Sequence, residues 1–253
     1  MKRMLVPVLT IVIIAAAIYW DQATYTPPGD DVTAIDTATL APDWGAISSW
    51  PPVDGIGVEP ASAEENPDPW QLTTLILLDD SASMNTRMEA AKQAVIEAVG
   101  QLAPESRVGI VALNAGIVLP VTRAGDAARS LPAQLAPIKP SGATPLGARL
   151  SEAMGILAAE ARQSRGFGVY RILVTTDGAA SDGNRMNNAV AEILSTTPIE
   201  LATIGVGIGE GHALNVPGYT SYVSVSSVDD LASALTAAAA EQTVFQPITQ
   251  FEE

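Results

Sequence analysis

Cysteine is absent from this 253-residue chain, and histidine occurs once, as His212. Without cysteine the chain can form no disulfide bond, no thiolate zinc site and no cysteine nucleophile. A single histidine excludes a metal site built from several histidines of one chain, and it argues against a Ser-His-Asp catalytic triad. A metal site in this sequence would therefore draw mainly on oxygen ligands.

Positive charge is also scarce, with 13 lysines and arginines against 28 acidic residues and a formal net charge of -15. A surface this acidic repels nucleic acid, so we do not expect a nucleic-acid partner. Hydrophobic residues make up 47% of the chain and charged residues 16%. This composition supports a sizeable core and argues against disorder throughout.

The first 20 residues predict a membrane segment. Lys2 and Arg3 precede about 17 apolar residues, residues 4–20, which is short but sufficient for a bilayer. Tyr19 and Trp20 suit the interfacial aromatic belt. Because no Lys or Arg follows Arg3 until residue 87, the positive-inside rule places the N-terminus in the cytoplasm and the body of the chain outside.

Two alternatives to an uncleaved anchor remain open for this segment. Ala15, Ala16 and Ala17 could form the cleavage site of a signal peptide, and the helix could instead be buried in a soluble domain. The anchor and the signal peptide both imply export, to a periplasmic or extracellular location or to secretion after cleavage.

The next segment, residues 21–70, is read as a proline-rich acidic spacer. Residues 21–69 hold eight of the 18 prolines and ten acidic residues, and no basic residue. Such a composition favours extended, semi-rigid chain. Free linkers rarely carry tryptophan, however, so Trp44, Trp50 and Trp70 leave open that part of 43–70 packs on the following domain.

From residue 71 to residue 241 the hydrophobic period alternates between that of strands and that of helices, and residues 242–253 form a tail. Apolar runs predict strands at 72–78, 107–113, 116–122, 169–176, 199–206 and 222–225. Amphipathic periods predict helices at 85–102, 126–135, 145–163, 185–195 and 228–241. The first of these helices has an inward stripe formed by Met88, Ala91, Val95, Ala98 and Leu102.

This alternation predicts an α/β fold with a doubly wound, mostly parallel sheet and helices on both faces. The connection between the second and third strands is too short for a helical crossover, so we expect one antiparallel strand at an edge of the sheet.

Two carboxylates directly follow buried strands, Asp79 and Asp177. In doubly wound sheets ligands bind beyond the carboxyl ends of the strands, where the winding reverses. Ser81 and Ser83 follow Asp79 at alternate positions, and Thr144 precedes a proline suited to a first helical turn.

These elements resemble a known family. Asp79-Asp80-Ser81-Ala82-Ser83, then Gly142-Ala143-Thr144-Pro145-Leu146, then Thr175-Thr176-Asp177-Gly178 resemble the metal-ion-dependent adhesion site of von Willebrand factor A domains. The resemblance covers about residues 72–241 and implies the same Rossmann-like fold. Ala82 and Ala143 replace glycines of the family, and neither position supplies a ligand side chain.

The resemblance implies that Asp79, Ser81, Ser83, Thr144 and Asp177 form the metal site, some of them through water. Carboxylate and hydroxyl oxygens suit Mg²⁺, or Mn²⁺ and Ca²⁺, better than zinc. Only two side chains of the set are anionic, and where one of them acts through water rather than by a direct bond, the ion keeps residual positive charge. The resemblance therefore also implies a protein partner that supplies a Glu or Asp to the metal.

Simpler interpretations stand beside this one. Ser81 and Ser83 could cap the helix beginning near residue 85, Thr144 could cap the next helix, and Asp177 could be a turn residue. Asp80 should point away from its neighbour, either as a loop residue or as a group that orients a ligand. His212 is expected near the same rim, as a loop residue, a partner contact or a pH-sensitive element.

Enzymatic alternatives find little support. A haloacid-type phosphatase needs a second acid where this chain has Ser81. The glycines from 205 to 211 lack the dinucleotide-binding register, and no phosphate-binding P-loop occurs. We therefore expect a binding module rather than an enzyme, or else an assembly component of a cell-envelope complex in which the metal is structural.

Overall fold

The computed structural model describes residue 35 and residues 37–52, 67–227 and 230–240. The predicted anchor or signal segment, most of the spacer and the C-terminal tail lie outside these residues. Among the helices described, none combines the length and the apolar character that a membrane span requires.

Six strands form one mixed sheet in the order β3-β2-β1-β4-β5-β6. Their bounds are Leu72–Leu78 (β1), Arg107–Ala112 (β2), Gly116–Arg123 (β3), Val169–Thr176 (β4), Glu200–Val206 (β5) and Ser221–Val225 (β6). All neighbours pair in parallel except β2 and β3, which form an antiparallel hairpin at the edge. The predicted edge hairpin and sheet class are thus confirmed.

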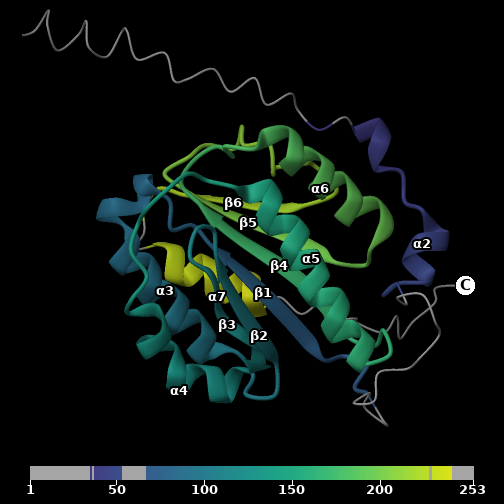
Figure 1. The fold of residues 1–253 in the computed structure, drawn as a ribbon, viewed down its shortest axis with the longest axis horizontal. Coiled ribbons are helices and arrows are strands. Elements are labelled where there is room, and N and C mark those ends of the chain that lie inside the picture. The colour runs from purple at the N-terminus through teal and green to yellow at the C-terminus, as the bar shows by residue number, and fades with distance from the viewer. Residues whose placement is uncertain (1–34, 36, 53–66, 228–229, 241–253) are drawn as a thin grey trace, which may run out of the picture. The chain divides into compact units, whose positions relative to one another are not determined.

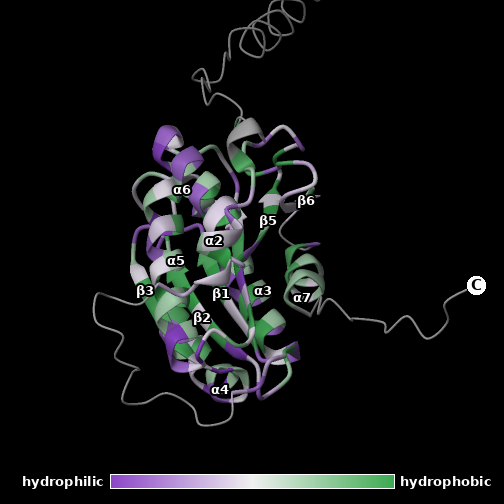
Figure 2. Cartoon of the chain, turned by 90° about the vertical axis from the view of Figure 1, so that its right-hand side faces the viewer, coloured by the Kyte–Doolittle hydropathy of each residue, from purple (hydrophilic) through white to green (hydrophobic). Residues whose placement is uncertain are grey.

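Helices cover both faces of this sheet (Figure 1). Helices α3 (Met88–Gln101), α4 (Ala124–Leu135) and α7 (Leu231–Ala240) share one hydrophobic core with one face. Helices α5 (Leu146–Gln163) and α6 (Gly183–Thr196) pack on the other, and Figure 2 shows the sheet between the two layers. All seven residues of β1 are buried, as expected for a strand covered on both sides.

The predicted stripe of the first helix is confirmed, since Met88, Ala91, Val95, Ala98 and Leu102 are all buried. The start of this helix was predicted too early. A 3₁₀ turn, η2 (Ala82–Thr86), precedes α3, because the Met84 amide already bonds the Ser81 carbonyl at 3.1 Å. Such tight turns are common at helix N-termini, and this one turns the serine side chains toward the sheet rim.

Part of the spacer region contacts the domain through η1 (Thr37–Leu40), α2 (Trp44–Ser48) and the residues after them. Leu40 is fully buried, and the Asp43 amide donates to the Ser195 carbonyl at 2.7 Å. Trp50 packs edge-on against Tyr170, with ring centroids 5.0 Å apart. The three tryptophans therefore differ, since Trp44 and Trp70 are largely exposed.

Candidate metal centre

The switch point of the sheet lies between β1 and β4. The chain winds from β1 outward to β2 and β3, then crosses to β4, β5 and β6 on the other side. Leu78 pairs with Thr175, so Asp79 and Asp177 follow neighbouring strands at their carboxyl ends. Two carboxylates almost 100 positions apart in the sequence thereby meet at one rim.

Asp79 is fully buried and is held from two sides. Its Oδ1 accepts the Ser81 amide at 2.9 Å, and its Oδ2 accepts the Thr176 hydroxyl at 2.8 Å. Burial raises the pKa of Asp79, and the nearby Asp177 charge raises it further, against the lowering effect of these hydrogen bonds. Sequence reasoning assigned no contact to Thr176, because only the pairing of β1 with β4 brings its side chain to Asp79.

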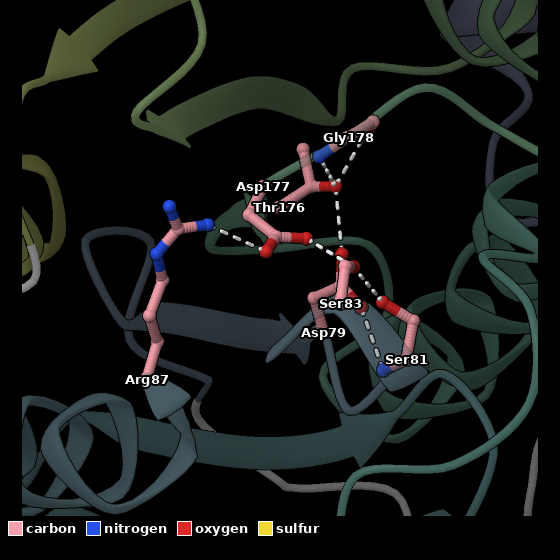
Figure 3. Close-up of polar contacts among 7 residues, drawn as sticks. All are labelled: Asp79, Ser81, Ser83, Arg87, Thr176, Asp177 and Gly178. Atoms are coloured by element: carbon pink, nitrogen blue, oxygen red, sulfur yellow. Dashed lines mark hydrogen bonds and ion pairs between the residues drawn. The ribbon is translucent and has the colours of Figure 1, made fainter. Parts of the chain in front are cut away.

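A chain of hydroxyl groups links the first loop to Asp177 (Figure 3). The Ser81 and Ser83 Oγ atoms lie 2.9 Å apart, and the Ser83 hydroxyl donates to Asp177 Oδ1 at 2.6 Å. Ser81 occupies the N-cap position of η2, yet its side chain makes no capping hydrogen bond. The capping interpretation therefore fails for these serines, whose side chains point to the carboxylate instead.

Arg87 was not among the predicted site residues, and the structure brings it into the cluster. Its Nη1 donates to Asp177 Oδ2 at 2.8 Å. The Asp177 side chain is only 1% exposed, whereas the Arg87 side chain is 41% exposed. Asp177 is therefore more than a turn residue: both of its oxygens accept hydrogen bonds. A basic residue four positions after Ser83 is the sequence feature that could have indicated this contact.

Thr144 is placed between the other two loops by backbone contacts. The Gly142 carbonyl accepts the Ala82 amide at 3.2 Å, and the Thr144 carbonyl accepts the Ser181 amide at 2.9 Å. Gly142 has φ +72°, and a Cβ there would lie 2.4 Å from the Asn114 side-chain oxygen, so the turn requires glycine. Within the described residues the Thr144 hydroxyl has no hydrogen-bond partner, which leaves its oxygen available.

The cap of α5 comes from a different loop. Pro145 occupies the N-cap position without a side-chain bond, and Asp182 accepts the Gly147 and Ala148 amides, both at 2.9 Å. The prediction that Thr144 could cap this helix is thus wrong, because Asp182, at the end of the third loop, accepts the hydrogen bonds of its first amides. Nothing in the spacing of the sequence indicates a cap 35 residues away.

Asp80 is also fully buried, but it faces the β2–β3 turn. Its Oδ1 accepts the Asn114 amide at 2.7 Å and the Asn114 side chain at 3.1 Å, and its Oδ2 accepts the Ala115 amide at 3.0 Å. The Asn114 side chain also donates to the Ala143 carbonyl at 2.9 Å. Asp80 therefore braces the hairpin and, through Asn114, the loop that carries Thr144.

His212 lies beside the third loop. Its Nε2 is 3.2 Å from the Gly178 carbonyl, and its Nδ1 accepts the Leu214 amide at 3.1 Å. These partners fix the tautomer with the proton on Nε2. The ring also stacks on Tyr222, with centroids 6.2 Å apart. Both ring nitrogens are thus engaged with backbone groups.

The donor set suits a hard cation. Within the described residues no three His, Cys, Asp or Glu side chains gather in a way that could hold a metal. What gathers instead is a mixed set of hydroxyl and carboxylate oxygens at one rim. A serine hydroxyl that donates a hydrogen bond to a carboxylate, as Ser83 does, keeps lone pairs that can bind Mg²⁺. The residues present therefore fit an oxygen-bound divalent ion.

Residues 74–179 match the family model of the von Willebrand factor type A domain, and the chain contains a domain of this type. The matched range includes Asp79, Ser81, Ser83, Thr144 and Asp177. A search of curated proteins gives no match.

Three solved structures illustrate the shared fold. A von Willebrand factor type A protein from Catenulispora acidiphila has a TM-score of 0.56 and 21% identity over 68% of this chain. The pilus adhesin SpaC from Lactobacillus rhamnosus GG has a TM-score of 0.53 and 14% identity over 70% of this chain. Proximal thread matrix protein 1 from the mussel byssus, with a zinc-occupied MIDAS motif, has a TM-score of 0.53 and 19% identity over 70% of this chain. The chain spans 42%, 30% and 48% of these three proteins, respectively.

Proposed function

We propose that this von Willebrand factor A domain binds a partner protein through a divalent cation held by Asp79, Ser81, Ser83, Thr144 and Asp177. The observation that carries the proposal is the hydrogen-bonded cluster of hydroxyls and buried carboxylates at the switch point of the sheet. The fold shared with a pilus adhesin supports a binding role, because that protein is an adhesin by name.

Mg²⁺ is the proposed ion, with Mn²⁺ or Ca²⁺ as substitutes. All five candidate side chains offer oxygen, and the single histidine already uses both nitrogens elsewhere. The mussel protein holds zinc in a motif of the same type. Zinc in this chain would be bound by oxygen ligands alone, and such a set suits Mg²⁺ better than zinc.

The proposed partner group is a Glu or Asp side chain. Two carboxylates, Asp79 and Asp177, leave a bound divalent ion without full charge compensation, since Arg87 already neutralises part of the Asp177 charge. When bound, the ion would supply positive charge and a water position that a partner carboxylate can take. The domain's own residues orient that position through the serine–aspartate hydrogen bonds.

We further propose that the domain acts outside the cytoplasm, tethered by residues 1–20. The support is the sequence: Lys2 and Arg3 before an apolar run, and no further basic residue until Arg87. The proposal of a binding module rather than an enzyme rests on the cluster itself, in which each contact serves to hold oxygens in place.

The first test is metal binding by the full-length chain. Mn²⁺ titration followed by electron paramagnetic resonance should detect a site that Mg²⁺ competes for. Asp79→Ala and Thr144→Ala should weaken it more than about tenfold. Asp126→Ala is the matched control, since Asp126 is an exposed aspartate of α4, away from the rim. Equal Mn²⁺ binding by all four proteins would refute the assigned ligands.

The second test concerns the partner. Crosslinking in intact cells, followed by mass spectrometry, should identify proteins captured by the wild-type chain and by Asp126→Ala, but not by Asp79→Ala or after chelation. An alternative is an assembly component with a structural metal. In that case chelation lowers the melting temperature, and association persists in the folded fraction. Metal-dependent turnover of a phosphoester panel, lost in Asp79→Asn, would instead indicate an enzyme.

A further inference from the structure

We propose that the rim carries a basic ring, formed by Arg87, Lys139 and Arg185, and that the ring recognises an acidic protein segment rather than one isolated carboxylate. This inference rests on the proposed function and specifies the partner further. It starts from the distribution of charge at the rim, where the carboxylates of Asp79, Asp80 and Asp177 are buried. Of the three basic residues, Lys139 and Arg185 are exposed and Arg87 is partly exposed.

Each of the three ligand loops contributes one member of the basic ring. Arg87 follows η2 and stands beside Asp177. Lys139 precedes Ser141, whose amide bonds the Asp80 carbonyl at 2.8 Å. Arg185 is in the first turn of α6, and its backbone lies so close to α5 that a Cβ on Gly147 would be 2.5 Å from the Arg185 carbonyl carbon. The three basic residues therefore belong to the same loops and helix starts as the candidate ligands.

The basic ring has spare binding capacity. Among the described residues neither Lys139 nor Arg185 has an ion-pair partner, and Arg87 uses one nitrogen on Asp177. The guanidinium of Arg87 also lies against Gly207 at the end of β5, since a Cβ there would be 3.5 Å from Nη2. An arginine presents five donors, so Arg87 can hold Asp177 and still contact an incoming carboxylate.

The carboxylates at this rim do not cancel that surface charge. Asp79 and Asp80 are fully buried and hydrogen-bonded, the Asp177 side chain is 1% exposed, and Asp182 caps α5. On the β5 side the exposed Glu210 carries the opposite sign and marks the limit of the basic ring. A partner approaching the β1–β4 side thus meets exposed positive charge in a chain whose net charge is -15.

This contrast favours a short acidic segment as the partner. Charge complementarity attracts carboxylates to the basic ring, and it adds to affinity and to association rate. A long polyanion such as nucleic acid would extend past the ring onto the acidic remainder of the protein, where it is repelled. The segment that fits therefore places one carboxylate on the metal and flanking carboxylates on Lys139 and Arg185.

A hexaglutamate peptide is the probe, titrated into the full-length chain with Mg²⁺ present, with hexaglutamine as the uncharged reference. The double variant Lys139→Gln/Arg185→Gln should weaken hexaglutamate binding about fivefold, the size expected for two exposed charge pairs. Arg123→Gln/Arg129→Gln is the charge-matched control. Arg123 pairs with the first residue of β2, at the other end of the sheet, and Arg129 is on α4. This control should change binding less than twofold.

Mn²⁺ affinity, measured on the same proteins, separates the two proposals. If Mn²⁺ binds normally while the rim double variant and the control bind hexaglutamate equally, the basic ring is refuted and the metal site stands. If the wild type does not bind Mn²⁺, the proposed function fails and the basic ring fails with it. A single-stranded oligonucleotide that binds as tightly as hexaglutamate, with the same dependence on Lys139 and Arg185, would overturn the choice of an acidic protein segment.

Discussion

Asp79 and Asp80 are adjacent at the end of β1, and they belong to two different regions of the rim. Asp80 faces the β2–β3 turn, where three N–H donors saturate it. Asp79 faces β4, where it accepts one amide and one hydroxyl beside a second carboxylate, and burial raises its pKa. Equal burial thus has different consequences. Asp80 stabilises the loops that it contacts, whereas the negative charge of Asp79 is unfavourable until a cation binds at the proposed metal site.

Removing the Asp80 carboxylate should have the largest effect on folding. Asp80→Ala leaves the donors of Asn114 and Ala115 unpaired in a buried place, and we expect a loss of about 3 kcal/mol in the free energy of unfolding. Urea denaturation with metal chelated measures it. A loss below about 1 kcal/mol would show that Asp80 does not brace the hairpin.

Asp79→Asn should have the opposite effect and stabilise the chelated domain. Because the folded-state pKa of Asp79 is raised, its charge destabilises the chelated domain at neutral pH, and the penalty disappears as the pH falls through that raised value. Asn removes the charge, and its amide can donate to the Thr176 hydroxyl, whose proton is then free to turn from residue 79 to the Gly178 carbonyl, 3.0 Å away. We expect a higher melting temperature for the chelated variant at pH 7 and a smaller gain on mild acidification.

The same variant should lose the stabilisation that Mg²⁺ gives the wild type. Calorimetric scans with Mg²⁺ and with chelator, at matched pH, compare the two proteins directly. An Asp79→Asn protein that melts below the wild type under chelation would contradict the assignment of an unfavourable charge to Asp79.

Asp182→Ala tests the connection between the two regions. The substitution removes the cap of α5, which should cost about 1 kcal/mol of unfolding free energy. Because the neighbouring Ser181 amide holds the Thr144 carbonyl, Mn²⁺ binding should weaken as well. Asp182→Asn keeps an acceptor and should recover most of the stability. Unchanged Mn²⁺ affinity in Asp182→Ala would separate the cap from the metal centre.

Thr144→Ala should have the smallest effect on folding. Its hydroxyl makes no hydrogen bond within the described residues, so the chelated variant should unfold within about 0.5 kcal/mol of the wild type. Chemical denaturation under chelation provides the measurement. A larger loss would assign Thr144 to the structural region that Asp80 supports.

The sequence predicted the strands and helices well. Boundaries shifted where side-chain contacts, and not the hydrophobic periodicity, determine where an element begins. The helix start at residue 85 was displaced because η2 turns the serines toward Asp177. Arg87, Thr176 and Asp182 could not be assigned from the sequence, because each acts on a group that is distant along the chain. Arg87 and Asp177, for example, meet only because α3 begins and β4 ends at the same rim.

The sequence by itself determined the class of the fold, the oxygen chemistry of the candidate site and the loops that carry it. Alternating hydrophobic periods set the parallel sheet, and the absence of cysteine with a single histidine left hydroxyls and carboxylates. Only the tertiary structure decided which groups each of the two adjacent aspartates contacts: Thr176 for Asp79, and Asn114 and Ala115 for Asp80. Successive residues leave a strand in opposite directions, and the neighbouring strand, β2 or β4, defines what each one meets.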